Sequence, residues 1–102
     1  MIKVGIIGLG YWGPNLVRNF QNNRNCKLVA FCDLDNSLLK KYHNKFPDSK
    51  FYNDYKKLLK YSDIDACVIA TPVATHFDIA INALKNNKHV FVEKPLADSS
   101  LK

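Results

Sequence analysis

The chain has 102 residues, 47% of them hydrophobic, and a formal net charge of +6 at pH 7. This length suits one domain with its own core. No apolar run reaches the ~20 residues that cross a bilayer, and the N-terminus lacks a signal-peptide pattern. We therefore expect a soluble, cytoplasmic protein without membrane contact. The lysines fall mostly on the polar sides of predicted helices, without a basic stripe interleaved with aromatics, so we expect no nucleic-acid partner.

The first predicted element is a buried strand at Ile2–Ile7, a short, apolar and β-branched run bounded by glycine. A helix follows the glycines, with Pro14 well placed in its first turn. The apolar side of this helix is formed by Leu16, Val17 and Phe20. A strand therefore passes into a helix through a glycine-rich loop.

The same order of strand and helix repeats in the middle of the chain. Residues 27–32 form the second predicted strand, and Asp35 can cap the helix after it. The apolar face of that helix has four members, which are Leu38, Leu39, Tyr42 and Phe46. A short third strand at residues 50–52 and a brief helix after Asp54 follow.

The last third of the chain contains the most apolar strand candidate, residues 66–70. Apolar residues then recur at i, i+3, i+4 and i+7, which marks a helix; they are Phe77, Ala80, Ile81 and Leu84. Residues 86–87 can end this helix, and residues 89–92 form a fifth strand. Strands that are apolar on both faces and alternate with helices predict an α/β fold, a Rossmann-type, doubly wound parallel sheet of about five strands in one domain spanning residues 1–102.

The loop GLGYWG joins the first predicted strand to the first helix. Glycine suits this place because the turn is tight, the backbone approaches a pyrophosphate closely, and the helix N-terminus offers N–H groups and a positive dipole end to the anion. We therefore expect Gly8, Gly10 and Gly13 to bind a dinucleotide, and a purely structural turn is the alternative. Tyr11 and Trp12 are expected either to cover the cofactor or contact a partner domain, or to pack in the core.

Asp33 ends the second predicted strand, 20 residues after Gly13. A carboxylate there can accept hydrogen bonds from both hydroxyls of an adenosine ribose and would repel a 2′-phosphate. The pattern therefore favours NAD over NADP. The alternative is that Asp33 only begins a turn with Leu34 and Asp35.

Two further turns are expected at the same edge of the sheet, because parallel strands all deliver their C-terminal ends to one side, where ligands of this architecture bind. The fourth strand leads to residues 71–72 and the fifth to residues 93–95. The residues expected to meet the glycine loop and Asp33 there are Thr71, Pro72, His76 and Lys94.

Three segments resemble the Gfo/Idh/MocA family of NAD(P)-dependent sugar and polyol oxidoreductases: GIIGLGYWGPN, CVIATPVATHFDIAINAL and KHVFVEKPLA. The resemblance covers essentially the whole chain, and its Glu-Lys-Pro turn is far more specific than the glycine motif. It implies that Lys94 lies between nicotinamide and substrate and assists hydride transfer by binding the reacting hydroxyl or assisting its proton movement. An exposed lysine that merely follows a strand is the alternative.

The resemblance also implies roles for the neighbouring residues. Glu93 would orient the turn or contact the cofactor, and Pro95 would stiffen the turn. Thr71 and Pro72 would contact the dinucleotide through their backbone. His76 would lie near the nicotinamide-side ribose, the alternative being a helix-start histidine without a ligand.

The cysteine and histidine residues do not indicate a metal site. Cys26, Cys32 and Cys67 are odd in number and form no Cys-x-x-Cys pair, so buried thiols are expected in place of a disulfide framework or a zinc site. The three histidines lack ligand spacing with one another, and we expect no bound metal.

Members of the resembled family run to more than three times this length, and they carry a C-terminal substrate domain that this chain lacks. We therefore expect the cofactor-binding part of an NAD-dependent oxidoreductase of a sugar, polyol or nucleotide sugar, inactive alone. The fifth strand would be a sheet edge with Phe91 poorly covered, which invites pairing with another copy and predicts a homo-oligomer. The alternatives are a non-catalytic dinucleotide-binding regulatory or interaction module and, less favoured, an S-adenosylmethionine-binding loop.

Overall fold

The computed structural model describes residues 1–10, 13–61, 63–71 and 73–92. Within that part, five parallel strands form one sheet in the order β3-β2-β1-β4-β5. The strands are β1 (Ile2–Ile7), β2 (Cys26–Cys32), β3 (Lys50–Tyr52), β4 (Ala66–Ile69) and β5 (His89–Val92). The helices are α1 (Gly13–Gln21), α2 (Asn36–Lys45), α3 (Tyr55–Leu59) and α4 (Val73–Lys85).

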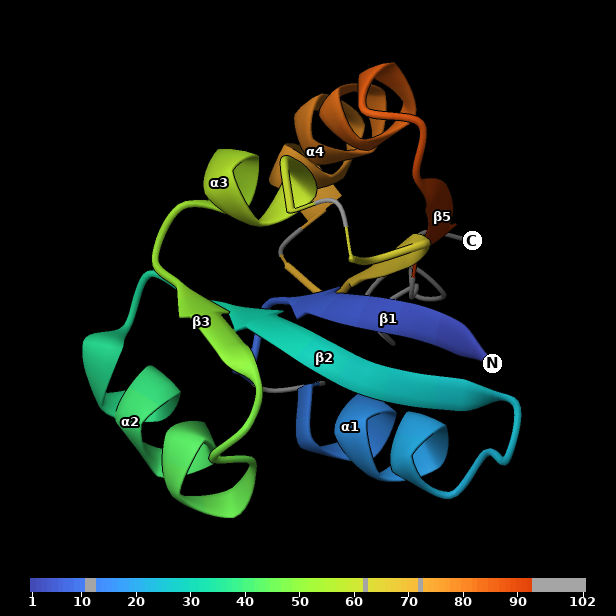
Figure 1. Cartoon of the computed structure of the whole chain (residues 1–102). Coiled ribbons are helices and arrows are strands. Elements are labelled where there is room, and N and C mark those ends of the chain that lie inside the picture. The colour runs from blue at the N-terminus through green and yellow to red at the C-terminus, as the bar shows by residue number, and fades with distance from the viewer. Residues whose placement is uncertain (11–12, 62, 72, 93–102) are drawn as a thin grey trace, which may run out of the picture.

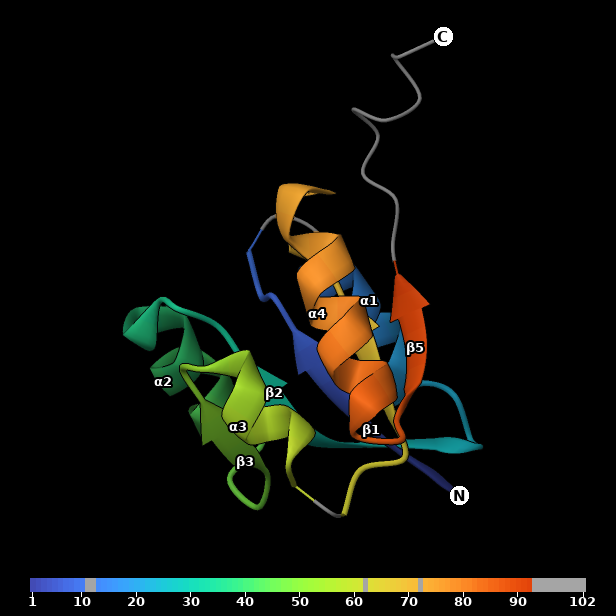
Figure 2. The same cartoon turned by 90° about the horizontal axis from the view of Figure 1, so that it is seen from above.

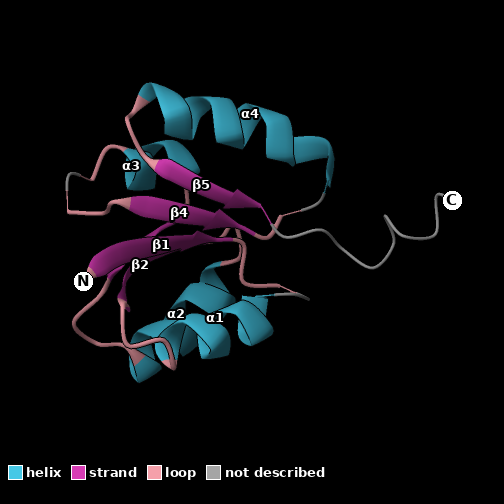
Figure 3. Cartoon of the chain, turned by 90° about the vertical axis from the view of Figure 1, so that its right-hand side faces the viewer, coloured by secondary structure: helices cyan, strands magenta, loops and turns pink. Residues whose placement is uncertain are grey.

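The helices form a layer on each side of the sheet. Helices α1 and α2 cover one face, and α3 and α4 cover the other (Figures 1 and 3). Figure 2 shows α4 running alongside β5. The predicted Rossmann-type α/β fold is confirmed, with two small differences at strand ends, since β2 begins one residue earlier than expected and β4 ends one residue earlier.

Each face of the sheet has its own core. On the side of α1 and α2, the fully buried Phe31 ring lies 5.8 Å from that of Tyr42, 5.0 Å from that of Phe46 and 5.3 Å from that of Phe51, measured between centroids. Burying a side chain of this size contributes roughly 1.5–3 kcal/mol. The core on the side of α3 and α4 includes Leu58, Leu59, Ile64, Cys67, Ile69, Ile79 and Ala83.

Two aspartates fix where the middle helices begin. The Asp35 side chain accepts a hydrogen bond from the Ser37 N–H at the start of α2, and the Asp54 side chain accepts one from the Lys56 N–H at the start of α3. Each carboxylate satisfies a backbone donor that has no partner inside the helix. The cap that the sequence predicts at Asp35 is confirmed, and the structure adds a second cap at Asp54, where the sequence predicts only that a brief helix follows.

The apolar periodicity that marks α4 does not coincide with the face that α4 buries. Phe77 is 72% exposed and Leu84 is 62% exposed, whereas Ile79 and Ala83 are buried against the sheet. A small side chain such as that of Ala83 lets the helix approach the strands closely, and the larger apolar groups are left outside. We call the three residues Phe77, Ile81 and Leu84 the α4 stripe, with Ile81 partly buried.

Strand β5 lies at one end of the strand order and pairs with β4. Phe91 is 49% exposed there, and its ring meets that of Phe20 edge-on, with 6.0 Å between the centroids. Phe91 is therefore poorly covered, as the sequence predicts. Separately, no helix in the described ranges is long and apolar enough to cross a membrane.

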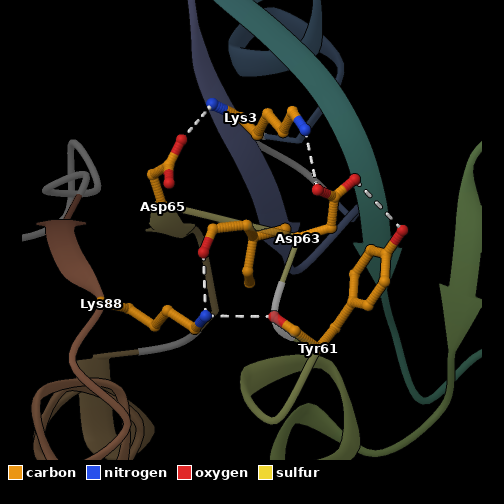
Figure 4. A network of polar contacts seen from close by, with 6 residues as sticks. Lys3, Tyr61, Asp63, Asp65 and Lys88 are labelled. Carbon is orange, nitrogen blue, oxygen red and sulfur yellow. Dashed lines mark hydrogen bonds and ion pairs between the residues drawn. The ribbon is translucent and has the colours of Figure 1, made fainter.

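A polar network joins the first strand to the loop before β4 (Figure 4). The backbone N–H of Lys3 donates to Asp65 Oδ2 at 2.9 Å, and Lys3 Nζ lies 2.7 Å from Asp63 Oδ1. This exposed ion pair lowers the pKa of Asp63 and raises that of Lys3, in both cases chiefly through their mutual hydrogen bond. The network therefore ties β1 to residues 60 and 62 positions later.

The same loop is held by Lys88, which lies between α4 and β5. Its Nζ donates to the carbonyl of Ile64 at 2.8 Å and to the carbonyl of Tyr61 at 3.0 Å (Figure 4). One partly buried ammonium thus satisfies two backbone acceptors in the connection from α3 to β4. We call these contacts of Lys3 and Lys88 the amino-edge network, because they lie where the strands begin.

Candidate functional site

The loop after β1 lies at the point where the strand order reverses direction, since β2 and β3 lie on one side of β1 and β4 and β5 on the other. In open parallel sheets, ligands bind at the carboxyl ends of the strands at such a reversal. The glycine loop, Asp33 and Thr71 all follow strands that end at this edge. The topology therefore places the described ones among the predicted site residues, namely the three glycines, Asp33 and Thr71, at one edge of the sheet.

Gly8 is required by the chain's own backbone. Its φ is +103°, and a Cβ built there would lie 2.8 Å from the backbone carbon of Ala70 and 3.0 Å from the nitrogen of Thr71. Side chains rarely adopt such a conformation, and the backbone of β4 leaves no space for one. The absence of a side chain at Gly8 lets the loop touch the end of β4.

Gly13 is required for a similar reason. It is the first residue of α1, and a Cβ there would lie 2.9 Å from the carbonyl oxygen of Gly8. The helix can therefore begin directly against the loop. Its first N–H groups and the positive end of its dipole lie beside the residues that follow β1.

Gly10 differs from the other two glycines of the motif, because a Cβ at this position would meet no atom within 4 Å. The packing of the described residues therefore does not explain why residue 10 is a glycine. Close approach of a ligand to the backbone would explain it, and a pyrophosphate is the group that such loops admit. The open space at Gly10 is compatible with a bound dinucleotide.

Asp33 contacts the loop directly. Its Oδ2 accepts a hydrogen bond from the Leu9 N–H at 2.7 Å, and its Oδ1 accepts one from the Asp35 N–H at 2.8 Å. The side chain is partly buried at the end of β2. The two interpretations of Asp33 in the sequence, a ligand of the site and the start of a turn, are therefore compatible in the structure.

The turn from β4 into α4 forms the third side of the site. A ring nitrogen of His76, Nε2, lies within hydrogen-bond distance of the Thr71 carbonyl oxygen, and the hydroxyls of Thr71 and Thr75 are 2.7 Å apart. A carbonyl oxygen can only accept, so Nε2 of His76 carries the proton in this contact. His76 thus holds the turn that touches Gly8.

The remaining predicted site residues lie outside the described ranges. They are Tyr11, Trp12, Pro72, Glu93, Lys94 and Pro95. Two residues that the sequence analysis did not select belong to the site: Leu9, whose N–H contacts Asp33, and Ala70, whose backbone contacts Gly8. The position of Leu9 between two glycines is the signal that could have identified it.

The cysteines are placed in the sheet and not in a ligand cluster. Burial raises the pKa of the Cys32 thiol to about 12, with a smaller contribution from the negative charge of Asp33. Burial also raises the pKa of Cys67 to about 11. No cluster of three or more residues that could ligate a metal is found among the described parts of the chain.

Comparisons with known proteins agree with this geometry. A family model described as the oxidoreductase family with an NAD-binding Rossmann fold, Gfo/Idh/MocA, matches residues 2–101. Inositol 2-dehydrogenase of Salmonella typhimurium (strain LT2) is 36% identical in an alignment of 98 residues, which covers 94% of this chain and 29% of that protein. Glycosyl hydrolase family 109 protein 2 of Shewanella sp. (strain ANA-3) is 34% identical over 105 residues, covering 94% of this chain and 23% of that protein.

Solved structures show the same fold within longer chains. Scyllo-inositol dehydrogenase from Lactobacillus casei, with bound NAD(H) and scyllo-inositol, matches 93% of this chain and 28% of its own, with a TM-score of 0.87 and 31% identity. Biliverdin reductase from Synechocystis sp. PCC 6803, in complex with biliverdin and NADP+, matches 93% and 30%, with a TM-score of 0.83 and 32% identity. The chain thus spans less than a third of the length of the relatives it matches.

Proposed function

Because the chain belongs to the Gfo/Idh/MocA oxidoreductase family, with its NAD-binding Rossmann domain, we propose that it is the cofactor-binding part of an NAD-dependent dehydrogenase that acts on a sugar, polyol or nucleotide sugar. The observation that carries this proposal is the open space at Gly10 beside the start of α1. The inositol dehydrogenases among the relatives support the polyol and sugar class of substrate.

The residues of the loop suit the parts of a dinucleotide. The pyrophosphate would lie over Gly10, where the α1 N-terminus favours an anion. The ribose hydroxyls would donate to the Asp33 carboxylate, and a 2′-phosphate would be repelled by its charge, so we propose NAD as the preferred cofactor. When bound, the nicotinamide supplies the hydride acceptor or donor of the reaction.

The test of this site is a variant of Gly10. Gly10→Ala adds a methyl group where no atom lies within 4 Å, so the fold should persist while NADH affinity falls at least tenfold. Trp12 is the single tryptophan, and its quenching during NADH and then NADPH titrations reports binding. Saturable quenching that is stronger with NADH supports the proposal, and equal affinities of the wild type and Gly10→Ala for NADH would contradict it.

The catalytic role proposed for Lys94 rests on the family motif. The ammonium would bind the reacting hydroxyl or assist its proton movement, with Glu93 and Pro95 orienting the turn. We also propose that Thr71 and Pro72 lie beside the dinucleotide and that Tyr11 and Trp12 cover it.

Catalysis also needs a substrate domain, so the 102-residue chain should bind the cofactor without turnover. The assay incubates the chain with NAD and myo-inositol or a sugar panel and follows absorbance of NADH. Substrate-dependent NADH formation would contradict the proposed need for further chain.

A non-catalytic dinucleotide-binding regulatory or interaction module is the second candidate, and the α4 stripe favours it, since its large apolar groups Phe77 and Leu84 are exposed and exposed apolar surface marks contact sites. The stripe and the position of β5 at the end of the strand order in the described residues also support the proposed homo-oligomer. Light scattering across a concentration series measures association directly. A Phe77→Gln/Leu84→Gln variant should associate less than the wild type, and a wild-type monomer at high concentration would contradict the oligomer.

A further inference from the structure

We propose that Asp33 is a positioning residue of the glycine loop as well as the group that selects the cofactor, so that loop order and cofactor choice depend on one carboxylate. This inference rests on the proposed dinucleotide site. The Leu9 N–H donates to Asp33 Oδ2 at 2.7 Å across a separation of 24 residues. The carboxylate therefore holds the loop through a bond within the chain itself.

The neighbouring contacts make this bond a structural anchor. The Gly8 N–H donates to the Cys32 carbonyl at 2.8 Å, so the loop leaves the β1–β2 pairing one residue before Leu9. The Leu9 side chain is buried in the core on the α1 side. Its N–H points at a charged acceptor, and such bonds are stronger than neutral ones. Removing the acceptor leaves a buried donor without that partner.

The number of acceptor sites on a carboxylate allows both roles at once. An ionised carboxylate offers about four lone-pair sites. The N–H groups of Leu9 and Asp35 use one on each oxygen of Asp33. One further site on each oxygen remains for the two hydroxyls of an adenosine ribose.

An amide at position 33 cannot reproduce this arrangement. It has one acceptor oxygen, and its NH2 group would face the N–H of either Leu9 or Asp35. A substitution that removes the negative charge, as a change to NADP would require, therefore also releases the loop or the turn. We expect Asp33→Asn to lower the affinities for NADH and NADPH together, each at least fivefold, instead of exchanging one cofactor for the other.

The experiment follows amide hydrogen exchange in the cofactor-free chain by NMR. Leu9 should exchange at least tenfold faster in Asp33→Asn than in the wild type, while the Ile6 amide of β1 keeps its protection. The matched control is Asp35→Asn, which alters the neighbouring carboxylate that caps α2 at Ser37 and should leave Leu9 exchange unchanged. Unchanged Leu9 exchange in a folded Asp33→Asn variant would overturn the proposal.

A measurement on the wild type keeps the test decisive where the variant does not fold. A scalar coupling across the hydrogen bond, from the Leu9 amide nitrogen to the Asp33 carboxylate carbon, should be detectable. Its absence, with couplings of the β1–β2 pairing present, would also overturn the proposal. Both readouts use cofactor-free protein, so they stay informative if no dinucleotide binds. If no dinucleotide binds but both readouts are as expected, the proposed function fails while the role of Asp33 in holding Leu9 is supported.

Discussion

The two edges of the sheet are built differently. At the carboxyl edge, backbone groups, three glycines and one carboxylate lie close together, and a Cβ at Gly10 would meet nothing. At the amino edge, Lys3 and Lys88 fill the equivalent region with side chains that bond the loop before β4 (Figure 4). The carboxyl edge has open space at Gly10, and the amino edge uses its polar groups to hold the chain together. Changes at Gly10 and at the amino edge should therefore separate the proposed binding from stability.

The largest effect is expected from Gly8→Ala, because a methyl group would meet backbone at 2.8 Å in a residue with positive φ. Strain of this kind costs of order 1–3 kcal/mol, and the displaced β4 backbone adds to it. We expect a loss of about 3 kcal/mol in the free energy of unfolding, measured by urea denaturation. Gly10→Ala is the comparison, and its stability should change by less than about 1 kcal/mol. Equal losses of stability for the two variants would mean that Gly8 is no more tightly constrained by the backbone than Gly10.

Thiol labelling should distinguish the two ends of β2. Cys26 begins the strand and is partly exposed, whereas burial raises the pKa of Cys32, which ends the strand, to about 12. At pH 8 only on the order of one Cys32 thiol in ten thousand is then ionised, and the thiolate is the reactive form. Mass spectrometry after brief alkylation should find Cys26 labelled about a hundredfold faster than Cys32. Similar rates would show that the β2 end opens readily.

Lys88→Met should remove two hydrogen bonds from the amino edge and leave the carbonyls of Tyr61 and Ile64 without this donor. Bonds from a charged donor contribute about 1–3 kcal/mol, so thermal and urea unfolding should show a loss in that range. NADH affinity should stay the same, because the change is at the far edge. Lys85→Met, on the exposed end of α4, is the control and should have little effect. If the Lys88→Met variant is as stable as this control, the Lys88 bonds of the amino-edge network do not stabilise the fold.

The smallest effect is expected from Asp63→Asn, which removes the exposed ion pair with Lys3. The pKa of Asp63 is lowered in the folded chain, so its contribution is present above the unfolded pKa and is lost as the pH falls through the folded pKa. Solvent and salt screen such pairs. Urea midpoints at pH 7 should be almost equal for wild type and variant and should converge further in acid. A large difference at pH 7 would show that this pair belongs to the cooperative core of the amino-edge network.

Local patterns in the sequence were sufficient to predict much of the fold. The strands, the cap at Asp35 and the glycine loop all depend on residues that lie within a few positions of one another. The placement of Asp33 at the loop also followed, because parallel strands deliver their ends to one edge.

The features that the sequence did not show depend on distant contacts. The buried face of α4 is chosen by the sheet beneath it, and the small Ala83 fits there better than the larger Phe77. The bonds from Lys88 to two loop carbonyls and from the Leu9 N–H to Asp33 join side chains to backbone across 24 residues or more. Neither periodicity nor composition contains this information, since any exposed lysine or loop aspartate has the same local pattern.

The central position of β1 affects how the protein is made. This strand pairs with β2 on one side and β4 on the other, and Lys3 meets Asp65, 62 residues later. At translation rates of about 5–20 residues per second, roughly 3–12 s pass between synthesis of the two. During this time one edge of the nascent sheet has no native partner on the ribosome. We therefore expect chaperones to bind the nascent chain in the interval before β4 emerges.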